Sequence, residues 1–472
     1  MTELLLFAAG VAVSLAASWL LVSRLERLGE RAGFSEAWLG LVAALAADAP
    51  EITSAVTALV RGQPSVGAGV VIGSNVFNLA ALLGLAAAVA GRISFHRRVV
   101  LLAGLPGMWI AAVTLLTVAA VVAPAAGLAL TAAVFVPYAA VLGMRRARLE
   151  GLRLPTGWVR WLTTAVHEEE DELAEAIRPR RGTWRDALAA AAALVTVVGA
   201  SMVMEVAATA AGRRYAIADI VTGGLVLAVV TSLPNAVSAV YLARRGRGAA
   251  VLSTALNSNA INVLAGLLVP ASLAGLGPRS GAGTLVAGWY AGLTALALAL
   301  AYRGRGLGRP AGAAIIAGYL AFVAALAVSV AQGGVRPVVA VLPAAVIAAA
   351  GALLLASPDG QEQRESLLPG WSVGRLWKLS LALIVAVAAC DAASGPRLIL
   401  IGMLIAGPCC ALLTGRWALT AAASGFALAL GGLLGVPDQI FATATQYALL
   451  AVVAIAGVAA TAGAAVLQRR HG

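Results

Sequence analysis

Two acidic residues stand in the middle of an apolar stretch near the N-terminus. Asp48 and Glu51 are three residues apart and Ser54 follows three residues later, so a helix places all three side chains on one face. Pro50 has no N–H to donate, which frees a backbone carbonyl oxygen in the preceding turn as a further ligand. An ionised carboxylate costs at least about 2.5–3.5 kcal/mol in the middle of a membrane helix, and no Arg or Lys accompanies the pair, so it predicts a cation site.

Further oxygen-bearing side chains occur in other apolar stretches. They are Ser74, Asn75 and Asn78 in the first half of the chain, and Thr231, Ser232, Asn235, Ser238, Asn257, Ser258, Asn259 and Asn262 in the second. All are hard oxygen donors, which suit sodium, calcium or magnesium better than zinc or copper. For the individual serines and asparagines, the alternative is packing between membrane helices through interhelical hydrogen bonds.

These polar residues belong to an internal repeat. The stretch from Gly40 to Gly62 aligns without gaps on the stretch from Gly224 to Gly246, and the same offset of 184 residues carries GSNVFN, from Gly73, onto NSNAIN, from Asn257. Matched alanines and leucines follow from composition, but matched proline, serine and asparagine indicate duplication. Five predicted spans separate the corresponding helices, and this odd number turns the second copy upside down in the bilayer. Inverted repeats of this kind build the midplane sites of many transporters.

The composition predicts an all-α integral membrane protein. Hydrophobic residues make up 61% and charged residues 11% of the chain, against roughly 45–50% and about 25% in soluble domains. Apolar runs near the roughly 20 residues that cross a bilayer recur throughout. They predict spans at 3–23, 37–60, 65–90, 98–121, 124–144, 185–204, 216–243, 247–275, 281–302, 312–331, 337–356, 376–393, 396–414, 416–435 and 441–467. The first of these lacks a preceding basic segment and is predicted to be a retained helix.

The net charge of +12 does not indicate nucleic-acid binding, because the arginines fall in short loops between spans. With fifteen spans, the basic clusters all lie on one side of the membrane: Arg24, Arg27, Arg31, Arg92, Arg97, Arg98, the loop 145–185, Arg244, Arg245, Arg247, Arg303, Arg305, Arg309, Arg364, Arg375, Arg469 and Arg470. The positive-inside rule makes this side cytoplasmic, with the N-terminus outside the cell membrane and the C-terminus inside.

We predict five segments along the chain. They are a first inverted repeat at 1–144, a charged cytoplasmic linker at 145–184, a second inverted repeat with one extra helix at 185–356, a polar linker at 357–375 and a four-helix membrane appendage at 376–472. The first linker carries the acidic run His167–Glu172, for which a solvated helix is favoured over a regulatory metal site. Cys390, Cys409 and Cys410 have no ligand or disulfide spacing and are interpreted as buried apolar residues.

The two motif pairs resemble the alpha repeats of the sodium/calcium exchanger family, the calcium/cation antiporters. That family carries a G-[ST]-S-x-P-E helix break followed by a G-S-N-[IV]-x-[ND] helix. The resemblance covers roughly residues 1–331 and implies ten helices in two inverted five-helix halves, to which about five C-terminal helices are added here. It implies that Glu51 is the calcium-binding acid of the first repeat. It further implies site roles for Ser74, Asn75 and Asn78, for Thr231 and Ser232, and for Ser258, Asn259 and Asn262.

The chain departs from the family pattern at two places. Asn235 stands where the family has a second acid, and Ala47 and Asp48 stand where the first repeat has a hydroxyl pair. The number of carboxylates is thus kept at two, but both lie on one half of the bundle. Two carboxylates one turn apart repel each other unless a cation or a proton lies between them.

The resulting prediction is a secondary-active cation antiporter that alternates access around an oxygen-ligand site and transports calcium in exchange for sodium or protons. The alternatives are a cation/proton exchanger and a non-transporting cation-binding membrane sensor. An enzyme is not predicted, because no nucleophile-and-base set or cofactor loop occurs and the histidines fall in loops or at the terminus. No resident cofactor is expected, and the predicted partners are cations and the lipid bilayer.

Overall fold

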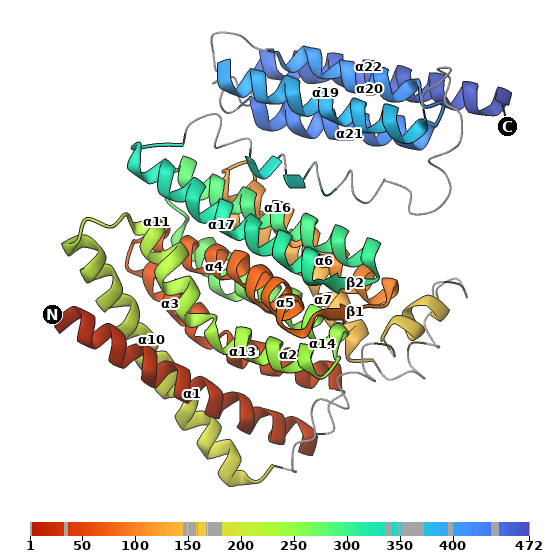
Figure 1. Cartoon of the computed structure of the whole chain (residues 1–472). Coiled ribbons are helices and arrows are strands. Elements are labelled where there is room, and N and C mark those ends of the chain that lie inside the picture. The colour runs from red at the N-terminus through yellow and green to blue at the C-terminus, as the bar shows by residue number, and fades with distance from the viewer. Residues whose placement is uncertain are drawn as a thin grey trace. The chain divides into compact units, whose positions relative to one another are not determined.

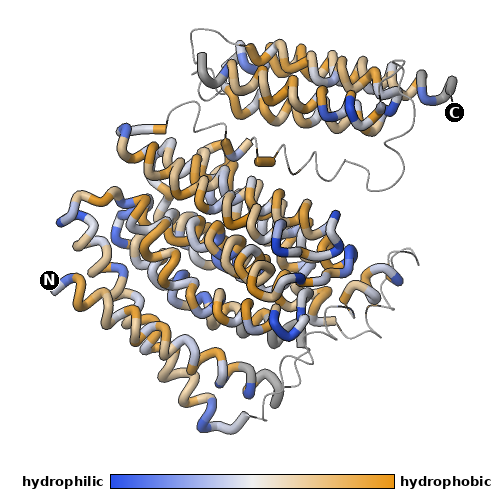
Figure 2. Tube along the Cα trace, viewed as in Figure 1, coloured by the Kyte–Doolittle hydropathy of each residue, from blue (hydrophilic) through white to orange (hydrophobic). Residues whose placement is uncertain are grey.

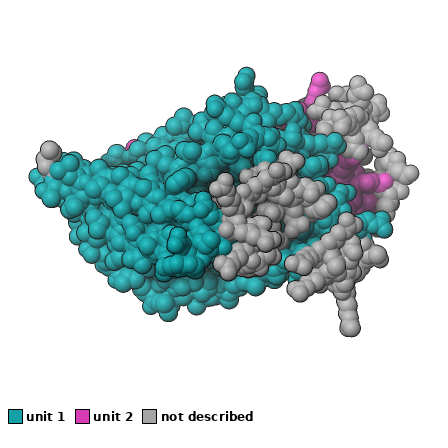
Figure 3. Space-filling view, turned by 90° about the horizontal axis from the view of Figure 1, so that it is seen from below, with its two compact units in different colours: residues 1–331 teal, residues 332–472 magenta. Residues whose placement is uncertain are grey.

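The computed structural model describes residues 2–32, 36–144, 182–335, 372–394, 400–435 and 443–471, with short pieces within 149–168 and 342–350. The chain forms two compact units, residues 1–331 and 332–472, which are coloured separately in Figure 3. Among the described residues, eleven helices are long and apolar enough to cross a bilayer, and a bent pair, Asp219–Thr231 with Leu233–Arg244, makes a twelfth. The predicted all-α membrane fold is confirmed.

The first half of unit 1 begins with the long N-terminal helix (Figure 1). Its elements are α1 (Thr2–Ala32), α2 (Glu36–Ala47), α3 (Ala49–Val60), α4 (Pro64–Asn78), η1 (Leu79–Leu85), α5 (Ala86–Ala90), β1 (Arg92–Ser94), α6 (Arg97–Val118) and α7 (Pro124–Leu142). The predicted span at 37–60 is therefore a broken helix, whose two halves meet at Asp48.

The second half repeats this arrangement. Its elements are α10 (Trp184–Arg214), α11 (Asp219–Val221), η2 (Thr222–Leu227), α12 (Ala228–Thr231), α13 (Leu233–Arg244), α14 (Gly248–Ile261), η3 (Asn262–Leu268), α15 (Val269–Ala274), α16 (Gly281–Gly304), β2 (Gly306–Gly308) and α17 (Arg309–Ala331). The predicted span at 185–204 was too short, because α10 continues for ten further residues to Arg214. This extension brings Glu205 inside the helix.

Both copies break at the same place and for the same reason. Pro50 lies in the first turn of α3 and Pro234 in the first turn of α13. Proline has no N–H and its ring clashes with the preceding turn, so it begins a new helix more readily than it continues one. Asp48 and Ser232 consequently stand at the two breaks, and the second break bends the chain by 45°.

The helices that follow each break share a second irregularity. α4 passes into the π-helical turn η1 directly after Asn78, and α14 passes into η3 at Asn262. The wider π turn changes the rotation of the residues that follow it, and such turns are frequent at functional sites. The motif asparagines therefore stand where the helix geometry changes, which the sequence did not predict.

The two copies run in opposite directions through the bundle. β1 and β2 pair antiparallel, with Arg92 opposite Gly308, which places the ends of α5 and α16 on one side. α14 begins beside this ribbon, since Gly248 packs directly against Ser94. α4 begins at the other side, where a Cβ on Gly277 would lie 2.9 Å from Pro64. The predicted inversion of the repeats is thus visible in the fold.

Helices α1 and α10 lie against each other along much of their length (Figure 1). Gly10 permits the close approach, because a Cβ there would lie 3.0 Å from the Cβ of Met204. At one end Arg24 forms an ion pair of 2.8 Å with Asp186. Figure 2 shows apolar residues along most of both helices and hydrophilic residues toward their ends, as expected for helices that face lipid.

Unit 2 consists of α19 (Val373–Ser394), η5 (Ile401–Ile405), α20 (Ala406–Leu412), α21 (Trp417–Leu434) and α22 (Ala444–His471). Its own apolar core includes Ile384, Leu404 and Leu430. Cys410 is buried as predicted, but Cys390 and Cys409 are exposed, so the interpretation of all three cysteines as buried residues was wrong. The extra helix predicted at 337–356 and the linker at 357–375 lie largely outside the described residues.

Glycine sets the crossing of α4 and η2, which joins the two copies near the breaks. Any Cβ on Gly73 would overlap the Gly224 carbonyl oxygen, and one on Gly69 would lie 2.9 Å from the Gly224 nitrogen. We expect Gly73→Ala to destabilise the protein by about 1–3 kcal/mol, the typical cost of overpacking. Thermal unfolding of the detergent-solubilised protein measures this loss.

The matched control is Gly199→Ala in α10. A Cβ at Gly199 meets no other atom within 4 Å, and alanine favours a helix over glycine by up to about 1 kcal/mol. The control is expected to leave the midpoint of unfolding unchanged or slightly raised. Equal midpoints for the two variants would show that the crossing does not depend on Gly73.

Candidate cation site

The two acids of the first copy contact the broken helix of the second. Asp48 Oδ1 accepts hydrogen bonds from Asn235 Nδ2 and from Ser258 Oγ, both at 2.7 Å. Glu51 Oε1 accepts a hydrogen bond of 3.0 Å from Ser232 Oγ. Both acids are fully buried. Their hydrogen-bond donors are neutral, so these contacts leave the two negative charges uncompensated.

These contacts are related by the internal repeat. The offset of 184 residues carries Asp48 onto Ser232 and Glu51 onto Asn235. The contact of Asp48 with Asn235 and that of Glu51 with Ser232 therefore occupy equivalent places in the two copies. Asn235, at the position of the family's second acid, donates its amide to Asp48, so the acid and its neutral partner have exchanged positions between the copies.

The asparagines of α4 and α14 bind each other symmetrically. Asn75 Nδ2 donates to the backbone oxygen of Asn259 at 3.0 Å, and Asn259 Nδ2 donates to the backbone oxygen of Asn75 at 3.2 Å. Asn78 Nδ2 donates to Asn259 Oδ1 at 3.1 Å, and Asn262 Nδ2 donates to Asn75 Oδ1 at 3.4 Å. Each bond has its repeat-related counterpart, and all four residues are buried.

The remaining predicted residues fall into three groups. Ser74 Oγ donates to the Ala228 carbonyl at 3.4 Å, next to the second break. Thr231 Oγ1 donates within its own helix, to the Leu227 carbonyl at 2.9 Å. Ser54 is buried on α3, whereas its repeat partner Ser238 is exposed on α13. The structure thus brings most of the predicted residues together. The exceptions are Thr231, whose hydroxyl binds the backbone of its own helix, and Ser238, which is exposed.

Several oxygen atoms of this cluster have no hydrogen-bond partner among the described residues. They are Asp48 Oδ2, Glu51 Oε2, Ser54 Oγ, Asn78 Oδ1 and Asn262 Oδ1. A buried polar atom without a partner costs about 1–3 kcal/mol. Calcium binds six to eight oxygen atoms of this chemical type. The two carboxylates, the amide oxygens and the hydroxyl supply a donor set that suits a hard cation and come from both copies of the repeat.

Two tyrosines that support the cluster were not predicted from the sequence. Tyr290, buried on α16, forms a hydrogen bond with the side chain of Asn75. Tyr138 on α7 donates to Asn257 Oδ1 at 2.9 Å, and Asn257 Nδ2 donates to Ser253 Oγ at 3.0 Å. Asn257 is thereby engaged away from the acids. No sequence pattern indicates which residue a tyrosine inside an apolar span will bind.

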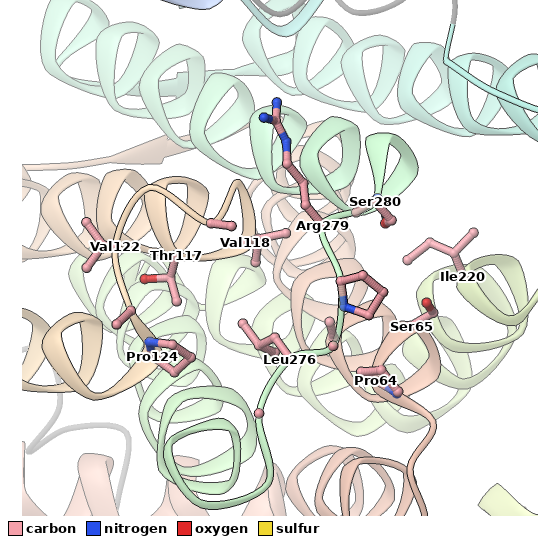
Figure 4. Close-up of a pocket in the computed structure, with 17 residues that line it drawn as sticks. Pro64, Ser65, Thr117, Val118, Val122, Pro124, Ile220, Leu276, Arg279 and Ser280 are labelled. Atoms are coloured by element: carbon pink, nitrogen blue, oxygen red, sulfur yellow. The ribbon is translucent and has the colours of Figure 1, made fainter. Parts of the chain in front are cut away.

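A cavity of about 400 Å³ lies at the end of the bundle where α4 begins (Figure 4). Pro64 and Ser65 of α4, Thr117 of α6 and Arg279 of the α15–α16 connection contribute to its wall. Ten residues of α4, about 15 Å of helix, separate Pro64 from Ser74. Since the acids themselves are buried, an ion that enters from this cavity requires a rearrangement of the helices to reach them.

Residues 2–154 and 187–328 match the family described as sodium/calcium exchanger protein. The chain belongs to this family. The membership predicted from the two motif pairs is confirmed, and both alpha repeats lie within the matched residues. Among solved structures, the chain is similar to one titled H⁺/Ca²⁺ exchanger CAX, with a TM-score of 0.55 and 16% identity over 75% of this chain and 88% of that one.

Two further proteins are similar to this chain. A structure of the sodium-calcium exchanger NCX_Mj matches with a TM-score of 0.46 and 18% identity, over 69% of this chain and 98% of that one. A putative antiporter, CaxA from Alkalimonas amylolytica, is 33% identical over 96 residues, which are 18% of this chain and 30% of that protein. The chain therefore matches less than a third of the length of this curated relative.

The exchanged positions of acid and amide can be tested directly. We expect Asn235→Asp to destabilise the exchanger by about 3–5 kcal/mol in the presence of a chelator, because it adds an unpaired buried charge beside Asp48. Calcium should restore much of the loss, since a cation that binds only the folded state stabilises it. Thermal unfolding in detergent, with and without calcium, measures both effects.

The control is the double variant Asp48→Asn with Asn235→Asp. It has an amide at position 48 and a carboxylate at position 235, so the contact again joins one carboxylate and one amide. Its stability in chelator should therefore lie close to that of the wild type. If the double variant is as unstable as Asn235→Asp alone, the repulsion between the two carboxylates is not what determines these residue types.

Proposed function

We propose that this exchanger is a secondary-active cation antiporter that carries calcium through the cluster formed by α3, α4, α13 and α14. The observation that supports this most strongly is the set of buried oxygen atoms without partners, drawn from both inverted copies. Calcium would neutralise the two acids and supply the missing contacts at once. A site of this composition, at the meeting point of inverted repeats, is the usual arrangement in secondary transporters.

The two copies of the repeat have different surroundings, as alternating access requires. α10 packs against α3, while α1 packs chiefly against α2 and α10. The consequence is seen at one pair of repeat-related positions, where Ser54 is buried and Ser238 is exposed. We propose that transport exchanges these two environments, so that first one broken helix and then the other is covered.

Sodium and the proton are the two candidates for the returning ion. Sodium is the ion expected from the family. The proton is favoured by the position of both acids on one helix, because two protons can neutralise Asp48 and Glu51 and balance the charge of one calcium ion. The name of the similar H⁺/Ca²⁺ exchanger is compatible with this second candidate.

Uptake of radioactive calcium into proteoliposomes tests the proposal. Vesicles loaded with sodium, or held at a different internal pH, should accumulate calcium only under the gradient that supplies the returning ion. We expect Glu51→Gln and Asp48→Asn to reduce calcium affinity by about 100-fold or more, because each removes a charge from the site. Glu3→Gln, an acid at the N-terminal end of α1, should retain wild-type uptake.

The outcomes separate the competing functions. Wild-type protein that binds calcium without moving it under either gradient would be a sensor rather than an antiporter. Unaltered calcium affinity in Glu51→Gln would remove the acid pair from the site.

We also propose the orientation with the basic side in the cytoplasm, which places the C-terminus inside.

A further inference from the structure

Glu205 is a buried acid that the proposed calcium site does not use. It lies inside α10, within the apolar span Trp184–Arg214, and its exposed fraction is 0%. An ionisable residue inside a membrane span costs free energy and therefore points to a function that requires it. Glu205 is one residue beyond the end of the span predicted at 185–204 and was not among the acids identified from the sequence.

The carboxyl group of Glu205 has donors on one oxygen only. Oε1 accepts a hydrogen bond of 3.0 Å from Thr209 Oγ1. Gln63, with its amide nitrogen turned toward α10, donates to the same oxygen at 3.2 Å, and its amide oxygen accepts from Arg213 Nη2 at 3.0 Å. Oε2 is buried and has no hydrogen-bond partner among the described residues. Gln63 therefore links the carboxylate to a guanidinium group.

Two basic residues lie near the carboxyl group of Glu205, one on its own helix and one at the end of α3. Arg61 at the end of α3 and Arg213 on α10 both act on its charge. The other charged groups at this end of α10 and of the helices packed against it are Arg214, which pairs with Glu3 of α1, and Asp219 at the start of α11. The element η2 contributes no charged residue.

This chemistry suits a proton and not a metal ion. A metal ion needs several oxygen ligands, whereas the neighbours of Glu205 Oε1 are hydrogen-bond donors and only Oε2 of this carboxyl group is left without a partner among the described residues. A proton needs only the one oxygen atom that remains, Oε2. When Glu205 is ionised, its bond to Gln63 is charge-assisted, and protonation removes that assistance.

The position of Glu205 connects it to both sides of the proposed calcium site. Gln63 lies between α3, which carries Glu51, and α4, which carries Asn75. On α10, Ser201 precedes Glu205 by one turn and forms a hydrogen bond of 2.8 Å with Ser14 of α1. One turn further along α1, Ser18 donates to the Ala46 carbonyl at 3.3 Å, two residues before Asp48.

We propose that Glu205 is a proton-binding site, distinct from the calcium site, that holds α10 to the connection between α3 and α4 when it is ionised and releases it when it is protonated. This inference rests on the proposed function, because the movement that it controls is the exchange of environments between the two copies. Acid pH on the side of Arg61 and Arg213 should therefore accelerate exchange.

Infrared difference spectroscopy tests the proton site without relying on transport. A pH step applied to the purified exchanger should produce a carboxylic acid C=O band that is present in the wild type and in Glu3→Gln but absent in Glu205→Gln. The measurement is made with calcium bound, so that Asp48 and Glu51 stay ionised. A band that persists unchanged in Glu205→Gln would overturn the assignment of the proton to this residue.

Calcium exchange in proteoliposomes tests the control of movement. Glu205→Gln mimics the protonated form, so its rate at neutral pH should be roughly tenfold above that of the wild type and should vary little with the pH of the Arg61 side. Glu3→Gln should keep the wild-type pH profile. Calcium affinity, measured by calorimetry, should stay within about twofold of the wild type in both variants. This corresponds to a difference in binding free energy of less than about 0.4 kcal/mol.

Each outcome bears on one idea. A wild-type pH profile in Glu205→Gln would remove the proposed control while leaving antiport intact. A loss of calcium affinity in this variant equal to that in Glu51→Gln would make Glu205 part of the calcium site and overturn its separate role. Absence of calcium flux in wild-type vesicles would refute the antiporter proposal, and the infrared band would still decide whether Glu205 binds a proton. Glu205→Asp, which keeps the acid, should retain the band if Glu205→Gln fails to fold.

Discussion

The burial of two carboxylates between inverted helices is the constraint on which the rest of this exchanger depends. Asp48 and Glu51 have no basic partner among their contacts, and hydrogen bonds from Asn235, Ser258 and Ser232 satisfy only one oxygen atom of each. Neutral donors stabilise the charge in part. The remaining negative charge makes this part of the bundle attractive to a cation, and no comparable charge is found elsewhere in the four helices around it.

The symmetry of the repeat determines how the acids are accommodated. The side-chain hydrogen bonds to Asp48 and Glu51 come from the other copy, and the asparagine pairs of α4 and α14 fix the crossing at which the copies meet. At this crossing the positions 48 and 235 form one contact, so a carboxylate on one side is best matched by an amide on the other. The departure from the family pattern at positions 48 and 235 is thus an exchange of roles between two facing residues.

The same helices have features that suit the proposed movement between the two copies of the repeat. The proline breaks divide two helices of the proposed site into segments, and the glycines of α4 and η2 allow the copies to pass closely. α10 packs against α3, whereas Ser238 on α13 is exposed. Glu205 lies on α10 and not on the helices of the proposed calcium site. It gives the contact between α10 and the α3–α4 connection a charge that a proton can remove, which connects the packing of the bundle to the pH of one compartment.

The sequence by itself determined the membrane fold, the inverted repeat and the residues of the cluster. The length of apolar runs, the proline breaks and the matched Ser and Asn residues are local features of the amino-acid sequence. They predicted that Asp48, Glu51, Asn75, Asn259 and their neighbours lie close together. Only the tertiary structure decided which residues touch, because contacts 180 or more residues apart depend on how helices cross. It paired Asp48 with Asn235, excluded Ser238 and added Tyr290. It also showed that Glu205, just beyond the span predicted at 185–204, lies inside α10 with its side chain buried. An apolar span of average length gives no sign that packing against a neighbouring helix will extend it.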